Sequence, residues 1–565
     1  MTNFTVKKVA VLGAGVMGAQ IAAHCVNAKV PVVLFDLPGK EGTPKNGIVM
    51  RAIENLKKLS PAPFGDKEDA ALIQVANYDD NLDQLADCDL IIEAIAERMD
   101  WKHDLYKKVA PHIGANAIFA SNTSGLSINK LAEGFDEGLK ARFCGVHFFN
   151  PPRYMHLVEL IPTEATRPEI LDQLETFLTS VLGKGVVRAK DTPNFIANRV
   201  GIFGMLATIH EAEKFGLSVD VVDDLTGAKL GRAKSGTFRT ADVVGLDTMG
   251  HVIKTMQDNL ADDPFFALYK TPEVLAKLVE KGALGQKTGA GFYKKVGKDI
   301  QRLDFATGEY VAGGAKAADI IGRILKEKDP VKKFKALRES TNPQGQFLWA
   351  IFRDAFHYIA YHLDTIADNA RDIDFAMRWG FGWSVGPFET WQAAGWTQIA
   401  EWVRQDIDEG KALTNAPLPA WVFDGQVAEK GVHTAEGSYS AKSNSYAPRS
   451  TLDVYKRQEF RAPVVGTGGL DAKTAGITVF EDESVRLWHS GDEVLVLSLK
   501  TKMHVIGGGV IKGLQRGLEE AEKGYKGLVI WNTDAADGGA FSAGADLQES
   551  LPLFMQGGAK ALGPI

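Results

Sequence analysis

The feature that most constrains this 565-residue chain is a glycine-rich turn close to its start. Gly13, Gly15 and Gly18 are spaced as G-x-G-x-x-G and follow directly on the apolar run Val9–Leu12. That run predicts a buried strand, and residues 18–28 predict the helix that follows the turn. A strand, a turn of this kind and a helix open a doubly wound α/β domain that binds a dinucleotide.

Each residue of the turn has a physical role in such a site. Gly13 allows the tight turn, Gly15 lets the backbone approach a pyrophosphate, and Gly18 lets the helix pack close to the strand. Val16 and Met17 belong to the same predicted site, at a helix N-terminus that faces negative charge.

The second strand indicates which dinucleotide is bound. Residues 32–35 form an apolar run that ends on Asp36. A carboxylate at this place accepts hydrogen bonds from a ribose hydroxyl and repels a 2′-phosphate. We therefore predict NAD as the cofactor in preference to NADP.

Composition excludes several other classes of protein. Hydrophobic residues make up 45% of the chain and charged residues 24%, with a net charge of −7, so nothing indicates a nucleic acid partner. The chain contains no apolar run of about 18 residues, which argues against a membrane span. Cys25, Cys88 and Cys144 have neither disulfide nor metal-site spacing, so we expect no bound metal and a cytoplasmic protein.

Hydrophobic patterning divides the remainder of the chain. Its first half alternates strand and helix patterns, as in a parallel sheet covered by helices, and long helical segments begin at 195–215. Residues 235–245 and 385–395 are similar, each with Phe and Gly seven residues apart, and Asp224 and Asp374 share the same offset of 150. Two tandem copies of one helical module are expected.

We therefore predict six parts. They are an α/β Rossmann NAD-binding domain (1–190), an all-α domain (191–297), a connector (298–343), a second all-α module (344–432), a linker rich in Ser, Gly, Thr and Pro (433–475) and a separate α/β unit (476–565).

A dehydrogenase that oxidises an alcohol needs a base for the hydroxyl proton, and histidine suits this role near neutral pH. The chain has twelve histidines, so local context must choose among them. His147 comes twelve residues before Glu159, and Ser124 follows the predicted strand 117–120. Strand ends of this kind face the cofactor crevice. Spacing alone still favours a buried structural role for His147 over that of a base.

Longer motifs carry a family resemblance. Residues 6–297 resemble an L-3-hydroxyacyl-CoA dehydrogenase, in the family's order and separations. The matching stretches are residues 13–18, 121–124, 145–151, 157–160, 190–199 and 285–293.

The resemblance implies a reaction and a set of site residues. His147, paired with Glu159, would remove the 3-hydroxyl proton of (S)-3-hydroxyacyl-CoA, and hydride would pass from C3 to NAD in fatty-acid β-oxidation. Ser124 and Asn198 would hydrogen-bond the reacting oxygen and position the substrate carbonyl. Family positions that contact NAD correspond here to Asp36, Glu97, Lys102, Ser124, Asn150 and Lys287.

The resemblance also bears on two further features of the sequence. Arg51, Lys57 and Lys58 either contact CoA phosphates or form a solvated helix face. The second helical module resembles the tandem repeat of larger fused dehydrogenases, and residues 348–351 stand where Asn198 would repeat. We therefore expect a structural module that packs on the first copy as a second subunit does in shorter relatives.

The last 90 residues resemble part of another family. Residues 539–549 resemble the oxyanion-hole segment of the crotonase (enoyl-CoA hydratase) superfamily, in which backbone N–H groups near Gly544 and Ala545 would polarise a thioester carbonyl. We expect a truncated crotonase-like domain without hydratase activity, as in an incomplete copy of a bifunctional β-oxidation enzyme. Its expected partners are a second copy of the chain or a β-oxidation complex with a thiolase.

Two alternative functions stay open at this point. One is an NAD-dependent dehydrogenase of a free hydroxy acid, and the other is a non-catalytic component that binds CoA or NAD in a β-oxidation complex. The presence of Ser124, His147, Glu159 and Asn198 together argues against the non-catalytic alternative.

Overall fold

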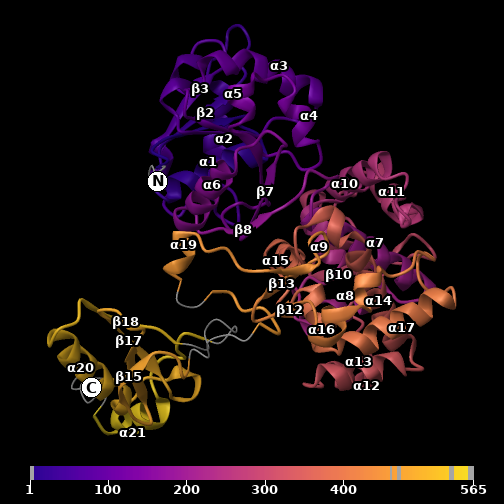
Figure 1. Ribbon diagram of the computed structural model, residues 1–565, viewed down its shortest axis with the longest axis vertical. Coiled ribbons are helices and arrows are strands. Elements are labelled where there is room, and N and C mark those ends of the chain that lie inside the picture. Colours follow the sequence, from indigo (N-terminus) through magenta and orange to yellow (C-terminus); the bar gives the residue numbers. More distant parts are fainter. Residues whose placement is uncertain (1–4, 459–460, 468–472, 533–539, 558–565) are drawn as a thin grey trace. The chain divides into compact units, whose positions relative to one another are not determined.

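A computed structural model describes residues 5–458, 461–467, 473–532 and 540–557. The chain forms two compact units, which we call unit 1 (residues 1–454 and 464–467) and unit 2 (residues 455–463 and 468–565). In Figure 1, unit 1 runs from indigo to orange and unit 2 from orange to yellow.

Unit 1 begins with an eight-stranded sheet of order β3-β2-β1-β4-β5-β6-β7-β8. The six strands from β3 to β6 are parallel, whereas β7 is antiparallel to β6 and parallel to β8. The strands are β1 (Val9–Leu12), β2 (Val32–Asp36), β3 (Ile73–Asn77), β4 (Leu90–Glu93), β5 (Ile118–Ser121), β6 (Phe143–Phe148), β7 (Leu157–Pro162) and β8 (Gly185–Arg188). The predicted Rossmann-type sheet is confirmed, and its order reverses between β1 and β4, where such sheets bind ligands.

Helices cover both faces of this sheet, which explains why its strands are continuous apolar runs. Val9 and Val11 pack in one core with the buried side of α1, whereas Phe119 and Phe143 pack with Tyr106 on the other face. The helices are α1 (Val16–Asn27), α2 (Gly47–Leu56), α3 (Met99–Val109), α4 (Ile128–Ala132), α5 (Glu137–Lys140) and α6 (Pro168–Ser180).

The helical part of unit 1 follows, drawn from magenta to orange in Figure 1. Its first copy has α7 (Ala197–Lys214), α8 (Val219–Thr226), α9 (Phe238–Val244), α10 (Leu246–Asn259), α11 (Glu273–Glu280), β9 (Tyr293–Val296), β10 (Asp299–Leu303) and β11 (Tyr310–Ala312). After α12 (Asp319–Leu325) and α13 (Pro330–Arg338), the second has α14 (Pro343–Ile366), α15 (Ala370–Phe381), α16 (Pro387–Ala393), α17 (Trp396–Asp408), α18 (Gly425–Lys430), β12 (His433–Thr434), β13 (Gly437–Ser440) and β14 (Ser445–Ala447). A short helix, α19 (Asp453–Lys456), comes next.

A buried aspartate caps the third helix in each copy. The Asp223 carboxylate accepts the backbone N–H of Phe238 at 2.7 Å, and Asp374 accepts that of Phe388 at 2.7 Å. Asp223 is therefore the counterpart of Asp374. The offset of 150 residues paired Asp374 with Asp224 instead, and this prediction is wrong. Adjacent helical residues point in directions about 100° apart, so a shift of one residue in α8 selects a different carboxylate.

The three-stranded sheets of the two copies are anchored alike, with different side chains. In the first copy Asp242 accepts the N–H of Tyr293 at 2.9 Å, and the Tyr293 hydroxyl donates to Asp223 at 2.8 Å. In the second, Gln392 accepts the N–H of His433 at 2.9 Å, and His433 Nε2 lies 2.6 Å from Asp374. Residues 433–447, which we expected to be part of a linker, thus pack against the second module.

Unit 2 is a four-stranded sheet of order β15-β16-β17-β18, antiparallel except for the parallel pair β17 and β18. Helix α20 joins this pair, and its Val510 packs on Leu487 and Leu497. The elements are β15 (Ile477–Glu481), β16 (Val485–His489), β17 (Val494–Leu499), α20 (Gly508–Glu522), β18 (Gly527–Ile530) and α21 (Leu547–Gly557). The strands and helix predicted between residues 477 and 531 are confirmed.

In the part of the chain that the structure describes, no helix combines the length and the apolar character that crossing a bilayer requires.

The buried Asp242 predicts a pH effect on the stability of unit 1. Burial raises the pKa of its carboxyl from 3.8 to about 6. The folded protein therefore keeps a proton that the unfolded chain has released, and this contribution is complete below pH 3.8 and lost as the pH rises through about 6. Relative to an Asp242→Asn variant, the wild type should lose about 2 kcal/mol of unfolding free energy between pH 4 and 7.

Urea unfolding of both proteins at several pH values measures this difference. Asp262→Asn, at an exposed carboxylate, is the control and should show no such slope. A pH-independent difference between wild type and Asp242→Asn would contradict the prediction.

Candidate active site

The glycine turn between β1 and α1 holds two positions that exclude a side chain and one that does not. A Cβ added at Gly13, where φ is 108°, would lie 2.8 Å from the Ala94 carbonyl oxygen, and one at Gly18 would lie 1.8 Å from that of Gly13. A Cβ at Gly15 would meet no atom within 4 Å. The fold therefore requires glycine at 13 and 18, whereas Gly15 leaves the backbone open to close approach by a ligand.

The end of β2 is tied to this turn. The Asp36 carboxylate accepts the N–H of Ala14 at 2.7 Å and that of Leu37 at 2.7 Å. Val16, the first residue of α1, is 70% exposed, and Met17 is half-buried. An exposed helix N-terminus beside a carboxylate at a strand end offers sites for a phosphate and for a ribose hydroxyl.

Sequence reasoning missed Glu93, the last residue of β4. Its buried carboxylate lies 2.6 Å from Lys102 Nζ, accepts the Tyr106 hydroxyl at 2.6 Å and accepts the Ser121 hydroxyl at 2.8 Å. Burial and this carboxylate raise the pKa of Tyr106 well above its usual range. Lys102 is 1% exposed, so its charge is balanced inside the protein. A glutamate that ends an apolar strand is the one sequence signal for this cluster.

Glu97 holds the turn that carries Ser124. Its carboxylate accepts the Thr123 hydroxyl at 2.6 Å and the Ser124 N–H at 2.7 Å. The Ser124 hydroxyl then lies 3.2 Å from His147 Nε2.

His147 and Glu159 face each other on neighbouring strands. They are direct partners in the antiparallel ladder of β6 and β7, which puts both side chains on the same face. His147 Nδ1 lies 2.8 Å from Glu159 Oε2, and the two residues are 3% and 0% exposed. The structure thus aligns Ser124, His147 and Glu159, with Nε2 of the imidazole toward the serine.

Helix α7 completes the surroundings of Glu159. Oε1 of this carboxylate accepts the backbone N–H of Ile196 at 3.1 Å and that of Ala197 at 2.8 Å. Because the N-terminus of a helix carries partial positive charge, these N–H groups direct that charge at the carboxylate. Asn198 lies in this first turn, is half-buried, and makes no side-chain hydrogen bond within the described residues.

The other residues predicted to contact NAD or CoA make hydrogen bonds and ion pairs elsewhere in unit 1. Asn150, just after β6, accepts a hydrogen bond from Gln20 of α1 at 3.2 Å. Lys287 forms an exposed ion pair with Asp247 at 2.6 Å. Arg51 of α2 is exposed, and Lys57, which directly follows α2, pairs with Glu54 at 2.7 Å.

In unit 2 the segment that contains Gly544 and Ala545 packs beside Ile506. The Ile506 N–H donates to the Gly544 carbonyl oxygen at 2.8 Å, and Ala545 is exposed. The Gly544 N–H donates to the Ser542 hydroxyl at 3.0 Å, so it is already engaged. Gly539, where the predicted oxyanion segment begins, lies outside the described residues.

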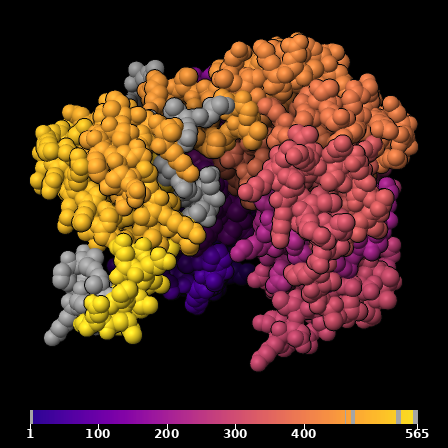
Figure 2. Space-filling model, turned by 90° about the horizontal axis from the view of Figure 1, so that it is seen from below, coloured from indigo at the N-terminus to yellow at the C-terminus, as the bar shows by residue number. Residues whose placement is uncertain are grey.

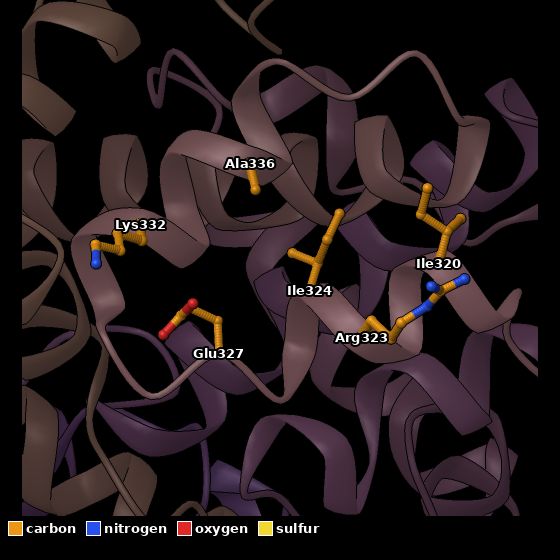
Figure 3. Close-up of a pocket in the computed structure, with 6 residues that line it drawn as sticks. All are labelled: Ile320, Arg323, Ile324, Glu327, Lys332 and Ala336. Atoms are coloured by element: carbon orange, nitrogen blue, oxygen red, sulfur yellow. The ribbon is translucent and has the colours of Figure 1, made fainter.

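Figure 3 shows a surface hollow between α12 and α13 of unit 1. Its lining residues are Ile320, Arg323, Ile324, Glu327, Lys332 and Ala336. None of the predicted site residues belongs to it. The described part of the chain also contains no group of three or more His, Cys, Asp or Glu side chains placed to hold a metal ion.

Comparisons with known proteins identify the family. Residues 8–192 match the family model "3-hydroxyacyl-CoA dehydrogenase, NAD binding domain", and residues 195–295 match "3-hydroxyacyl-CoA dehydrogenase, C-terminal domain". A "Probable 3-hydroxyacyl-CoA dehydrogenase" of Bacillus subtilis is 39% identical over 96% of this chain and 68% of its own length. A "Putative fatty acid oxidation complex trifunctional enzyme" of Rickettsia prowazekii is 32% identical over 98% of this chain and 70% of its own.

A solved structure shares the fold. The 3-hydroxybutyryl-CoA dehydrogenase of Escherichia coli aligns with 72% of this chain and 95% of its own, with a TM-score of 0.54 and 23% identity.

The open space at Gly15 predicts that binding and folding respond differently to substitution there. In Gly15→Ala the new methyl group meets no protein atom but occupies the approach to the turn. NADH affinity should therefore fall about tenfold or more, a loss of about 1.4 kcal/mol, with the melting temperature nearly unchanged. In Gly18→Ala the clash with Gly13 should lower the melting temperature.

Fluorescence titration with NADH and thermal melting measure these two effects. The control is Gly250→Ala, at a helical glycine where an added Cβ also meets nothing within 4 Å. Equal NADH affinity in Gly15→Ala and Gly250→Ala would rule out a dinucleotide at the turn.

Proposed function

Because the chain belongs to the 3-hydroxyacyl-CoA dehydrogenase family, we propose that it oxidises (S)-3-hydroxyacyl-CoA to 3-oxoacyl-CoA with NAD. The observation that carries this proposal is the alignment of Ser124, His147 and Glu159 at the edge of the sheet where β5 and β6 end. This arrangement supplies a hydroxyl, a base and an anion in the order that alcohol oxidation needs.

The residues fit the cofactor. The glycine turn is open at Gly15, α1 presents its N-terminus there, and Asp36 stands at the end of β2. When bound, NAD supplies the nicotinamide ring that accepts a hydride from C3. The residues proposed to hold it are Gly13, Gly15, Val16, Met17, Gly18, Asp36, Glu97, Lys102, Ser124, Asn150 and Lys287.

His147 is the proposed general base. Its Nε2 is the ring nitrogen on the side of Ser124, so it takes the proton of the substrate hydroxyl. Its Nδ1–H donates to Glu159, which fixes the tautomer and leaves Nε2 unprotonated, as the acceptor that faces Ser124. When Nε2 becomes protonated, the adjacent buried carboxylate stabilises the imidazolium.

Ser124 and Asn198 are proposed to position the substrate. The Ser124 hydroxyl lies 3.2 Å from Nε2, so it can hydrogen-bond the same oxygen that gives up its proton to His147. Asn198 offers an amide without a protein partner within the described residues, in the turn whose N–H groups hold Glu159. Such an amide can donate to the thioester carbonyl oxygen, which fixes C3 relative to the base.

We propose a crotonase-like fold for unit 2, which would bring a second CoA-binding surface to the chain. The proposal is supported by the segment 540–549 and by the parallel pair β17 and β18 joined through α20. Of the two predicted N–H donors, that of Ala545 is the better candidate. The Ala545 N–H has no partner within the described residues, whereas the Gly544 N–H donates to the Ser542 hydroxyl.

We also propose a metabolic role, partners and a cellular compartment for this chain. The Rickettsia relative is named as a trifunctional enzyme of a fatty acid oxidation complex, which supports a role of this chain in β-oxidation. A thiolase and a second copy of the chain are its proposed partners. The cysteines Cys25, Cys88 and Cys144 are buried thiols, which fits a reducing compartment such as the cytoplasm.

Replacing the proposed base tests the reaction. His147→Gln should lower kcat with a 3-hydroxyacyl-CoA by about 10²- to 10⁴-fold, because no group remains to take the hydroxyl proton. NADH affinity, measured by fluorescence titration, should stay within about twofold of wild type. His112→Gln, at an exposed histidine, is the matched control. Wild-type turnover in His147→Gln would exclude His147 as the base.

The choice of substrate separates the proposal from its alternatives. NADH formation should be faster with 3-hydroxyacyl-CoA thioesters than with the corresponding free hydroxy acids, measured across an acyl chain-length series. Equal rates on both would favour a free hydroxy acid dehydrogenase. Tight NADH binding without turnover on any member of the series would favour the non-catalytic component.

A further inference from the structure

The first turn of α7 controls the geometry of the site. Its N–H groups at Ile196 and Ala197 hold one oxygen of Glu159, whose other oxygen contacts His147. Asn198 belongs to the same turn. A small displacement of this turn would therefore move both the anion that orients the base and the amide proposed to position the substrate.

A buried network fixes this turn through Arg199, the residue after Asn198. The Arg199 guanidinium donates from Nε to the Tyr358 hydroxyl at 3.1 Å and from Nη2 to Asp263 at 3.1 Å. The Tyr269 hydroxyl lies 2.9 Å from the Tyr358 hydroxyl and donates to Asp263 at 2.9 Å. Three of these groups come from the first copy, but Tyr358 comes from α14 of the second.

The Tyr358 ring is itself held in place. It stacks on Phe203 of α7 with ring centroids 3.7 Å apart and an interplanar angle of 11°. Hydroxyl and ring therefore both contact α7. Figure 2 shows the surfaces of the two copies adjoining each other, in rose and orange.

Helix α15 of the second copy braces the same region from another side. A Cβ added at Gly201 of α7 would lie 2.0 Å from Phe381 Cζ, so the phenyl ring fills the place of a side chain there. A Cβ at Gly380 would lie 2.8 Å from Leu157 Cδ2, at the start of β7, the strand that carries Glu159. Lys190, which precedes α7, also donates to the Asp364 carbonyl oxygen in α14.

We propose that the second helical module is a positioning element for the active site of the first, with Tyr358 and Phe381 as its positioning residues. The module carries residues 348–351 where Asn198 would repeat. Its α14 contacts α7, and its α15 contacts both α7 and β7. They hold the first turn of α7 so that Glu159 and Asn198 keep their alignment with His147. This inference rests on the proposed function for its kinetic effect but not for its structural effect.

Tyr358→Phe is the sharpest test, because it keeps the stacked ring and removes the acceptor of the Arg199 Nε–H group. With a 3-hydroxyacyl-CoA, kcat should fall about tenfold, since catalysis is sensitive to sub-ångström misplacement. KM for NAD should stay within about twofold, because the glycine turn lies on other elements. The matched control is Tyr361→Phe, an exposed tyrosine on the same helix, which should behave as wild type.

A signal that does not depend on turnover accompanies the kinetics. In protein labelled with ¹⁵N-histidine, the Nδ1–H resonance of His147, identified by its loss in His147→Gln, reports on the contact with Glu159. It should shift in Tyr358→Phe and not in Tyr361→Phe. If wild type fails to oxidise every 3-hydroxyacyl-CoA, the proposed function fails, and the resonance still decides the inference.

A second pair of variants separates positioning from loss of stability. Gly201→Ala should displace Phe381 and lower kcat. Gly201→Ala combined with Phe381→Leu should recover most of the lost kcat, because the smaller leucine makes room for the methyl group and still packs on α7. An unchanged resonance with unchanged kcat in Tyr358→Phe would overturn the inference. The inference would also be overturned if the double variant did not recover kcat and if kcat fell in proportion to the melting temperature across all variants.

Discussion

The junction between the sheet and the helical part of unit 1 depends on one buried carboxylate, that of Glu159. A buried charge is strongly destabilising unless every oxygen is paired. Here one oxygen accepts two backbone N–H groups of α7 and the other contacts His147. This requirement fixes three things together: the register of β6 and β7, the entry of α7 and the ring orientation of the proposed base. The sheet and the helical part of unit 1 therefore meet at a point set by electrostatics as well as by apolar packing.

The sequence was most informative where the determining interactions are local. The strands around Gly13–Gly18 and the strand ending on Asp36 follow from runs of apolar residues and from turn chemistry, and the structure has them within one or two residues. The cluster at Glu93 could not be derived, because Lys102, Tyr106 and Ser121 are between 9 and 28 residues away and meet it only once the sheet is assembled. Residues 433–447 resembled a linker because their composition is polar, and their partner, Gln392, is distant in sequence.

The two helical copies show which parts of the module the fold requires. Both keep a buried aspartate that caps a helix and a polar side chain that anchors the first strand of a small sheet. The chemistry of that anchor differs, since Asp242 in one copy corresponds to Gln392 in the other, and Tyr293 corresponds to His433. The hydrogen bond at each place is preserved while the side chain that makes it is not. Sequence similarity between the copies therefore understates their structural similarity.

The donors to Glu159 come from two different parts of the chain. Of three hydrogen-bonding partners, only His147 belongs to the sheet, and the two N–H groups belong to α7. A polypeptide that stopped before α7 would bury a carboxylate with most of its partners missing, although its sheet would be complete in topology. The domain boundary predicted near residue 190 thus separates Glu159 from two of its three hydrogen-bonding partners. Docking of the helices thus completes the hydrogen bonding of a carboxylate that belongs to β7.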